Sequence, residues 1–214
     1  MKIYKDTVSE FLWEILVKLM DLEILEDFRL VGGTSLSLLL GHRISNDIDL
    51  FTDSEYGTIN FEEIGNVINS IFSYVEIEHW QNNVIGNTCF IGMNRENMVK
   101  VDFFYTDPFV FPVQNFMGIR LSKIEEIIAM KLQIIGNGGR KKDFWDIHEL
   151  TNYYTIQQML QFYLKRYPYS YSEKEILSQL LNFKEAEYDF DPICLKGKYW
   201  ELIKLDFEEM ISQI

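Results

Sequence analysis

Two aspartates separated by one residue are the most distinctive chemical feature of this 214-residue chain. They lie in the segment DIDLF, which alternates polar and apolar residues as an expected strand would. Asp47 and Asp49 therefore share one face of that strand, where two carboxylates repel each other unless a cation lies between them. Mg²⁺ is commonly held by one or two carboxylates plus substrate phosphates, so the pair predicts a divalent-metal site. The alternative is that both carboxylates cap turns or face solvent.

A glycine pair lies upstream of these aspartates. The segment FRLVGG indicates a short strand that stops at Gly32 and Gly33, and Thr34 is expected to cap a helix running to Gly41. The glycines allow close approach of the backbone, and the amides of Thr34 and Ser35 would face an anion there. We interpret this turn as a phosphate site. The alternative is a turn that needs glycine only for its positive φ.

A third carboxylate is expected on a neighbouring strand. In KVDFFYTD, Lys100 and Asp102 occupy the same strand face. Three acidic residues on adjacent strands beside a phosphate site predict nucleotidyl or phosphoryl transfer with two metal ions about 4 Å apart.

A lysine interrupts an apolar helical stripe farther along the chain. Lys131 occupies a position of SKIEEIIAMKLQIIG where an aliphatic residue would be expected, so it needs an anionic partner. Asp143 falls four residues before Ile147 on the inner face of the next helix and could pair with Lys131. The lysine then either contributes to a nucleotide site or forms a structural ion pair; alternatively, its amine extends to solvent.

Basic residues that could contact a nucleic acid are few. One run follows the glycines at 136–139, and two more cations lie within the aromatic tract YYTIQQMLQFYLKRYPYSYS, which could stack on bases but is more simply the apolar face of a helix. The candidates are Arg140, Lys141, Lys142, Lys165 and Arg166.

The first part of the chain mixes helices and strands around these motifs. An amphipathic helix is expected over 7–25, and a capping box of Asn60 with Glu63 predicts a helix to about residue 74. Segments near 75–81, 84–93 and 98–105 indicate antiparallel strands.

From Ser122 onward the pattern is almost wholly helical. Ser122 with Glu125 and Ser172 with Glu175 form capping boxes. The sequence therefore predicts an α+β protein with a core at 1–121 and a helical region at 122–214 that completes the site.

Composition narrows the class of protein. The chain is 47% hydrophobic and 25% charged with four Pro, typical of a folded globular protein, and no apolar run approaches the roughly 18 residues of a membrane span. Two distant cysteines fit a reducing compartment, and we expect a cytoplasmic protein. The net charge of −13 means that a polyanion can bind only through a local basic patch or metal ions.

The chain resembles the AbiEii/AbiGii family of nucleotidyltransferase toxins, within the DNA polymerase β-like superfamily. The resemblance spans about residues 28–151 and rests on four motifs in order: GGTSLSLLLGHRISNDIDLF, KVDFF, MKL within a helix and KKDFWDIHEL. It implies a nucleotidyltransferase-type mixed sheet flanked by helices, with a C-terminal helical region.

The resemblance also implies residue roles. Nucleotide binding would fall to Gly32, Gly33, Thr34, Ser35, Arg43, Ser45 and Lys131. Metal binding would fall to Asp47, Asp49 and Asp102. These three carboxylates would act in catalysis with Lys131 and the acidic residue of the fourth motif, Asp143, although Asp146 remains an alternative.

The implied activity is metal-dependent transfer of an NMP from an NTP to an acceptor hydroxyl, with release of pyrophosphate and two Mg²⁺ or Mn²⁺ ions. Family toxins modify tRNA 3′ ends and are countered by a separately encoded antitoxin, so the expected partners are an NTP, an RNA and an antitoxin protein, with no membrane. One alternative is a small-molecule or protein hydroxyl as acceptor, which the net charge of −13 favours. The other is a non-catalytic binding module of the same fold, against which the intact carboxylate trio argues.

Overall fold

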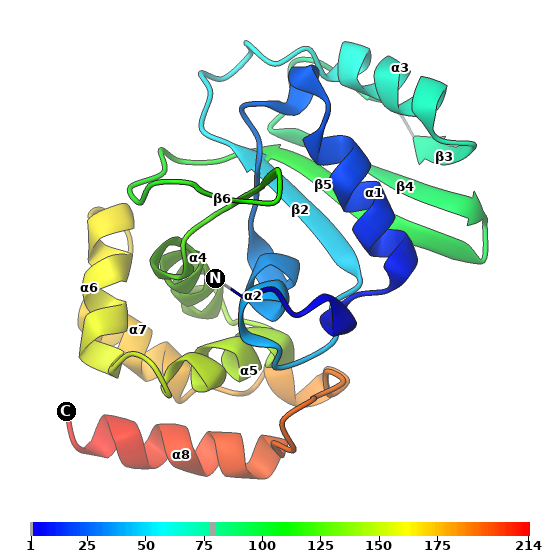
Figure 1. Ribbon diagram of the computed structural model, residues 1–214. Coiled ribbons are helices and arrows are strands. Elements are labelled where there is room, and N and C mark those ends of the chain that lie inside the picture. The colour runs from blue at the N-terminus through cyan, green and yellow to red at the C-terminus, as the bar shows by residue number, and fades with distance from the viewer. Residues whose placement is uncertain (1, 78–79) are drawn as a thin grey trace.

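The computed structural model describes residues 2–77 and 80–214, which form an α+β fold (Figure 1). Seven strands make one mixed sheet in the order β3-β4-β5-β2-β1-β7-β6. The strands are β1 Arg29–Leu30, β2 Asp47–Thr52, β3 Tyr74–Ile77, β4 Gly86–Asn94, β5 Asn97–Tyr105, β6 Gln114–Phe116 and β7 Ile119–Leu121. The helices are α1 Glu10–Met20, α2 Gly32–Leu40, α3 Phe61–Ile71, α4 Ile124–Gly136, α5 Lys141–Leu150, α6 Ile156–Arg166, α7 Glu173–Leu180 and α8 Trp200–Ser212.

Strand β2 lies in the middle of the sheet. It pairs in parallel with β5 and antiparallel with β1, which in turn pairs in parallel with β7. The predicted antiparallel pairing of the strands now seen as β3, β4 and β5 is confirmed. The strand expected near 75–81 is seen as far as Ile77, and residues 78 and 79 of that prediction lie outside the described residues.

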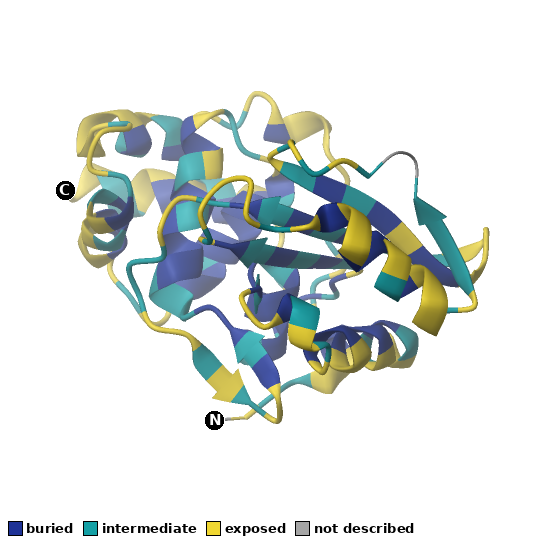
Figure 2. Cartoon of the chain, turned by 90° about the horizontal axis from the view of Figure 1, so that it is seen from above, coloured by how far each residue is buried: buried dark blue, intermediate teal, exposed yellow. Residues whose placement is uncertain are grey.

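One face of the sheet is covered by α1 and α3. Their apolar residues, such as Leu16 and Ile64, form one core with Ile48 and Leu50 of β2. The inner sides of these helices are buried and their outer sides exposed (Figure 2). The opposite side chains of β2, at Asp47 and Asp49, are thereby left to the other face of the sheet.

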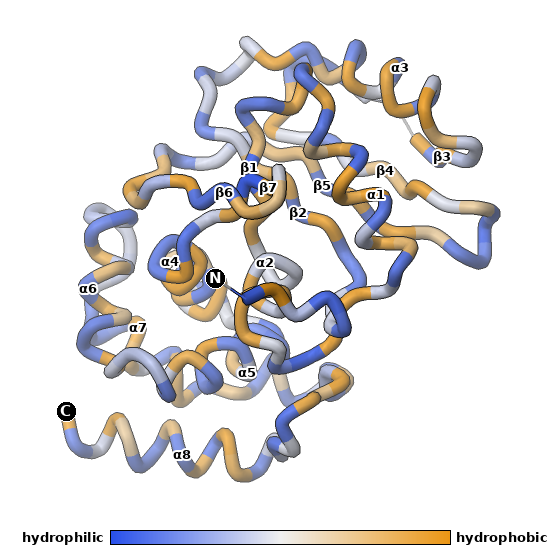
Figure 3. The backbone as a smooth tube through the Cα atoms, in the orientation of Figure 1, coloured by the Kyte–Doolittle hydropathy of each residue, from blue (hydrophilic) through white to orange (hydrophobic). Residues whose placement is uncertain are grey.

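A second core lies among the C-terminal helices. It gathers apolar residues of α4 to α8 together with Leu36 and Leu40 of α2, whereas Leu38 of the same helix belongs to the first core. Helix α2 therefore connects the sheet to the helical region. Hydrophobic and hydrophilic residues alternate along α8, which buries one side on this core (Figure 3). None of the helices in the described residues is long and apolar enough to cross a membrane.

The predicted helix starts are partly right. Asn60 and Ser172 cap α3 and α7 as expected. Ser122 does not cap α4, which begins after Lys123, and the Ser122 hydroxyl is buried without a partner among the described residues. Thr34 is likewise the third residue of α2 and not its cap, because the helix starts after Val31.

Arg166 is not available to a nucleic acid, so its prediction as a basic contact is wrong. Its side chain is buried and forms an ion pair with Glu126 of α4. It also donates hydrogen bonds to the carbonyls of Pro108 and Asp107, at 3.0 and 3.1 Å. The arginine therefore fastens α6 to the loop that follows β5.

We expect Glu126→Ala to destabilise the fold by about 3–5 kcal/mol, because it leaves the Arg166 charge buried and unpaired. The Glu126 carboxylate also accepts the amides of Val110 and Phe111 at 3.1 and 2.8 Å. The control is Glu125→Ala, whose acid forms no ion pair with a described residue. Urea unfolding of the two variants and the wild type would measure the difference. Equal midpoints for the two variants would contradict this role.

Candidate active site

Asp47 and Asp49 share one face of β2, as predicted, while Ile48 and Leu50 are fully buried on the other. Asp47 is partly exposed, with 43% of its side chain accessible. Burial, together with the neighbouring charges of Asp102 and Asp47, raises the pKa of Asp49 to about 6 against the opposing effect of Lys131. The charge of Asp49 is therefore disfavoured in the protein alone, which is the electrostatic situation that a bound cation relieves.

Asp102 lies beside Asp49, because the two residues are in register on the parallel strands β2 and β5. Its carboxylate accepts hydrogen bonds from the Thr88 hydroxyl at 2.6 Å and from the Lys100 amine at 2.5 Å. In the part of the chain that the structure describes, no three His, Cys, Asp or Glu side chains are arranged as a ready metal-binding group. The three-carboxylate metal site stays a prediction.

The glycine pair makes room for two functional side chains. A Cβ at Gly32, whose φ is +67°, would overlap the Asp49 carboxylate. A Cβ at Gly33 would overlap the guanidinium of Arg43. Both positions thus require glycine for space, and the turn is not one that needs glycine only for its positive φ.

The first turn of α2 faces the same region. The amides of Gly32, Gly33 and Thr34 have no acceptor within the helix, because they lie in its first turn. Gly32 and Gly33, which line the cavity, therefore join the predicted Thr34 and Ser35 as candidate amides for an anion. The Thr34 hydroxyl donates toward Ser45, 2.8 Å away, and contacts the Asp47 carbonyl, and the Ser35 side chain is buried. The Thr34 hydroxyl therefore binds the start of β2, whereas the Ser35 hydroxyl has no partner among the described residues.

Lys131 and Asp143 pair as predicted, with the amine 2.5 Å from Asp143 Oδ1. The amine also lies 2.8 Å from Asp146 Oδ2. Arg43 donates to both oxygens of Asp146 at 2.6 and 2.8 Å, and the His42 imidazole lies 2.7 Å from the same carboxylate. We call these five buried residues the ion cluster.

The ion cluster includes both acids proposed for the fourth motif. Burial alone would raise the pKa of Asp146, but Arg43 and Lys131 hold it well below its usual range. The pKa of Asp143 is also lowered, because Lys131 and Arg140 outweigh its burial. Asp143 also accepts the backbone amide of Arg140, so it fixes the start of α5 as well as Lys131. His42 is the member of the cluster that the sequence did not indicate, whereas Asp146 was expected only as the alternative to Asp143.

These groups surround a cavity of about 250 Å³, here called the inner cavity. Its polar walls include the glycine pair, the three carboxylates, Arg43, Ser45 and Lys131. Its apolar wall comes from β2 and α4, at Phe51, Ile127, Met130 and Ile134. The structure thus brings the predicted nucleotide and metal residues together, except that Asp143, Thr34 and Ser35 lie behind the wall.

Two further cations contact this region. Lys142 lies with its amine 3.7 Å from Asp47 Oδ2, and Arg140 lines the cavity beside it. Lys141 is different, because its amine is buried and pairs with Asp191 at 3.0 Å. Only Arg140 and Lys142 of the predicted basic run are therefore available at the site.

The fold is that of known nucleotidyltransferases. A crystal structure from H. pylori with a nucleotidyltransferase assignment superposes with a TM-score of 0.60 at 21% identity, over 95% of this chain and 91% of that chain. The nucleotidyltransferase toxin MenT4 from Mycobacterium tuberculosis superposes with a TM-score of 0.52 at 12% identity, over 87% of this chain and 76% of that chain. At these identities the likenesses show the fold, and the class of enzyme follows from the family to which the chain belongs.

The chain belongs to the AbiEii family. The family model described as "Nucleotidyl transferase AbiEii toxin, Type IV TA system" matches residues 14–213. An uncharacterised protein of Aquifex aeolicus is 27% identical over 209 residues, which cover 94% of each chain. Membership implies a nucleotide substrate and an antitoxin partner, and nucleotidyltransferases of this kind generally need divalent metals.

We expect Gly32→Ala to damage the site and not only the turn, because the new methyl would displace the Asp49 carboxylate. Gly57→Ala is the matched control, since Gly57 has a similar φ of +88° and a methyl added there would have no neighbour within 4 Å. The control should lose about 1–2 kcal/mol of unfolding free energy through backbone strain alone. Gly32→Ala should lose more and should lose transferase activity, as urea unfolding and turnover would show. Equal effects of the two substitutions would refute the steric role.

Proposed function

We propose that this chain transfers an NMP from an NTP to the 3′-terminal hydroxyl of an RNA, with tRNA as the expected acceptor. The observation that carries the proposal is the convergence of Asp47 and Asp49 with the glycine turn around one cavity. The carboxylates provide the oxygen ligands that Mg²⁺ prefers, and the helix start provides amides for phosphate oxygens.

Asp47 and Asp49 fit a divalent cation on their own chemistry. The raised pKa of Asp49 reflects burial and neighbouring negative charge, and both favour a cation at this position. Asp102 would be a third ligand. When bound, the metal would supply charge stabilisation for the transferring phosphoryl group.

The NTP phosphates would lie between the first turn of α2 and the cationic wall. Arg43 and Lys131 are held in the ion cluster, so their positive ends are fixed before the nucleotide binds. Such preorganisation limits the reorganisation needed when charge develops on the phosphoryl oxygens.

In the transfer step, the acceptor hydroxyl oxygen forms a bond to the α-phosphorus. The bond from that phosphorus to the bridging oxygen breaks, and pyrophosphate leaves with the electron pair. Asp102 would take the hydroxyl proton on a lone pair that its hydrogen bonds from Thr88 and Lys100 leave free.

We expect Asp47→Ala and Asp49→Ala each to lower NMP transfer by about 100-fold or more, since charge stabilisation here is worth several kcal/mol. Both variants should still fold, because each substitution removes repulsion between carboxylates. Mg²⁺ should raise the melting temperature of the wild type more than that of either variant. Glu55→Ala, which removes an exposed acid outside the cavity, is the control. Near-normal turnover or loss of activity by unfolding alone would contradict the metal role.

RNA is not the only candidate acceptor for this reaction. A net charge of −13 repels a free polyanion, which favours a small molecule or a protein hydroxyl. The burial of Lys141 and Arg166 strengthens this objection, because it removes two of the five cations expected to contact RNA. The RNA proposal then depends on Arg140, Lys142 and Lys165, together with the metal site.

We expect label from an α-labelled NTP to enter RNA when the protein is incubated with Mg²⁺, total cellular RNA and cell protein. The product should be sensitive to ribonuclease and resistant to protease, and Asp47→Ala should give none. Label that is sensitive only to protease, or that enters only small molecules, would replace the RNA acceptor with the competing assignment while leaving the transferase chemistry intact.

A further inference from the structure

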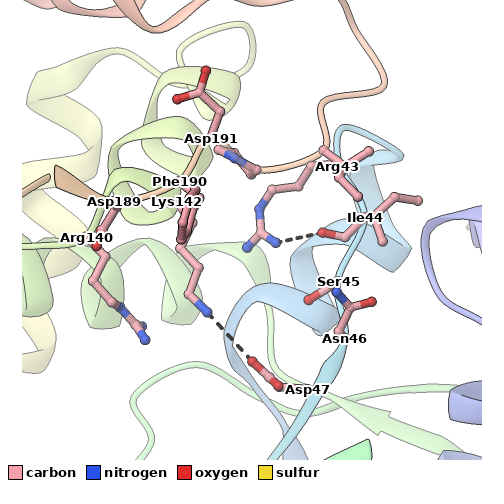
Figure 4. A pocket seen from close by; sticks show the side chains of 12 residues that line it. Arg43, Ile44, Ser45, Asn46, Asp47, Arg140, Lys142, Asp189, Phe190 and Asp191 are labelled. Atoms are coloured by element: carbon pink, nitrogen blue, oxygen red, sulfur yellow. Dashed lines mark hydrogen bonds and ion pairs between the residues drawn. The ribbon is translucent and has the colours of Figure 1, made fainter. Parts of the chain in front are cut away.

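A second pocket lies next to the inner cavity, on the far side of Asp47 (Figure 4). Its volume is about 360 Å³, within the range of small-ligand sites. We call it the outer pocket, and its walls are residues 43–47, residues 189–193, Arg140 and Lys142. Arg43, Ser45 and Asp47 line both cavities, as do Arg140 and Lys142. A ligand in the outer pocket would therefore reach the carboxylates of the inner cavity.

The segment 189–193 forms a wall that is tied down on both sides. The Ile44 amide donates to the Ile193 carbonyl, and the Leu195 amide donates to the His42 carbonyl, each at 2.9 Å. Lys141 anchors the other end, because its backbone amide donates to Asp189 at 2.9 Å. This wall lies between α7 and α8, in a stretch of the chain without a regular helix or strand.

The outer pocket is lined by three cations, Arg43, Arg140 and Lys142, and by three carboxylates, two of which lie on the wall 189–193 and one of which is Asp47. The two acids of the wall are engaged by Lys141, which donates from its amide to Asp189 and from its amine to Asp191. In Figure 4 Asp191 points away from Asp47, whereas the side chains of Arg140 and Lys142 extend toward it. The side chains of Arg140 and Lys142 are 55% and 37% exposed, so both are accessible to a ligand.

An aromatic side chain stands exposed on this wall. Phe190 is 99% exposed, although both of its neighbours are held by Lys141. A phenylalanine in this position buries no apolar surface in the fold, and its neighbours keep it beside the pocket. An exposed ring near cations is the arrangement with which proteins bind single-stranded nucleic acid, by stacking a base and holding its phosphate.

We propose that the outer pocket is the acceptor subsite and takes the terminal nucleotide of a single-stranded RNA end, an inference that rests on the proposed function. The base would stack on Phe190, and Arg140 and Lys142 would contact the adjacent phosphate. The terminal hydroxyl would then face the inner cavity past Asp47. The donor NTP belongs in the inner cavity, since this cavity, unlike the outer pocket, is lined by the glycine turn and by all three carboxylates. The outer pocket is the one with a fully exposed aromatic on its rim, where a polymer can continue into solvent.

Phe190→Ala tests the subsite through binding, without requiring transfer. Affinity for a fluorescein-labelled single-stranded ribo-oligonucleotide should fall by about 5- to 100-fold, the effect of losing one stacked base. Affinity for the magnesium complex of the NTP should stay within about 2-fold. Phe190→Trp should retain oligonucleotide binding, because it keeps an aromatic face. Tyr169→Ala is the matched control, since Tyr169 is also 99% exposed and lines neither cavity.

A second readout tests the phosphate contact. Lys142→Gln should reduce the slope of log affinity against log salt by about 0.7, the contribution of one phosphate contact on a single strand. Phe190→Ala should leave that slope unchanged, because a stacked base carries no phosphate charge.

The possible outcomes distinguish failure of the acceptor subsite from failure of the proposed reaction. If Phe190→Ala weakens NTP binding and spares the oligonucleotide, or weakens neither, the acceptor subsite is overturned. It is also overturned if wild type labels RNA and Phe190→Ala does so with the same KM for RNA, although the proposed function then stands. If the oligonucleotide loses affinity as expected while wild type labels no RNA, the subsite stands and the proposed reaction fails.

Discussion

The architecture of the site depends on a charge that has no contact with solvent. Asp146 is fully buried, and its carboxylate is bound by Arg43, His42 and Lys131, which come from the segment after α2 and from α4. Removing one partner of a buried ion pair typically costs about 3–5 kcal/mol, because it leaves an uncompensated charge in the interior. The segment after α2, helix α4 and helix α5 must therefore keep their relative positions, and this requirement ties the helical region to the segment that leads into β2.

The glycine pair connects this cluster to the carboxylates. Arg43 reaches Asp146 through space that a side chain at position 33 would fill, and Asp49 reaches its position through space that a side chain at position 32 would fill. The four sequence motifs are thus one interlocked unit and not four separate ligand sets. Each motif either leaves space for a side chain of another motif or supplies that side chain with its partner.

Local sequence patterns predicted those features of the fold and the site that depend on side-chain period and burial. The alternation around Asp49 and the aliphatic stripe interrupted by Lys131 indicated the strand face and the partner of the lysine, because side-chain period and burial decide both. The three-residue strands β6 and β7 are too short to show a period. The Asp146 contacts with His42 and Arg43 join residues more than 100 positions apart, and no spacing rule indicates them. Arg166 resembled a surface cation for the same reason, since its partner Glu126 is 40 residues away.

The same pairing of charges would let this acidic chain accept the polyanionic substrate that we propose. Two of the three carboxylates already have a lysine partner, Asp47 with Lys142 and Asp102 with Lys100, at 3.7 and 2.5 Å. Asp49 forms no ion pair within the described residues. A cation bound to these carboxylates, as we propose, would replace Lys100 and Lys142, which line the inner cavity and would then be left to the phosphate oxygens of the nucleotide. The local charge would therefore stay near balance when nucleotide enters, whereas the repulsion from the net charge of −13 is spread over the surface and screened beyond about 8–10 Å.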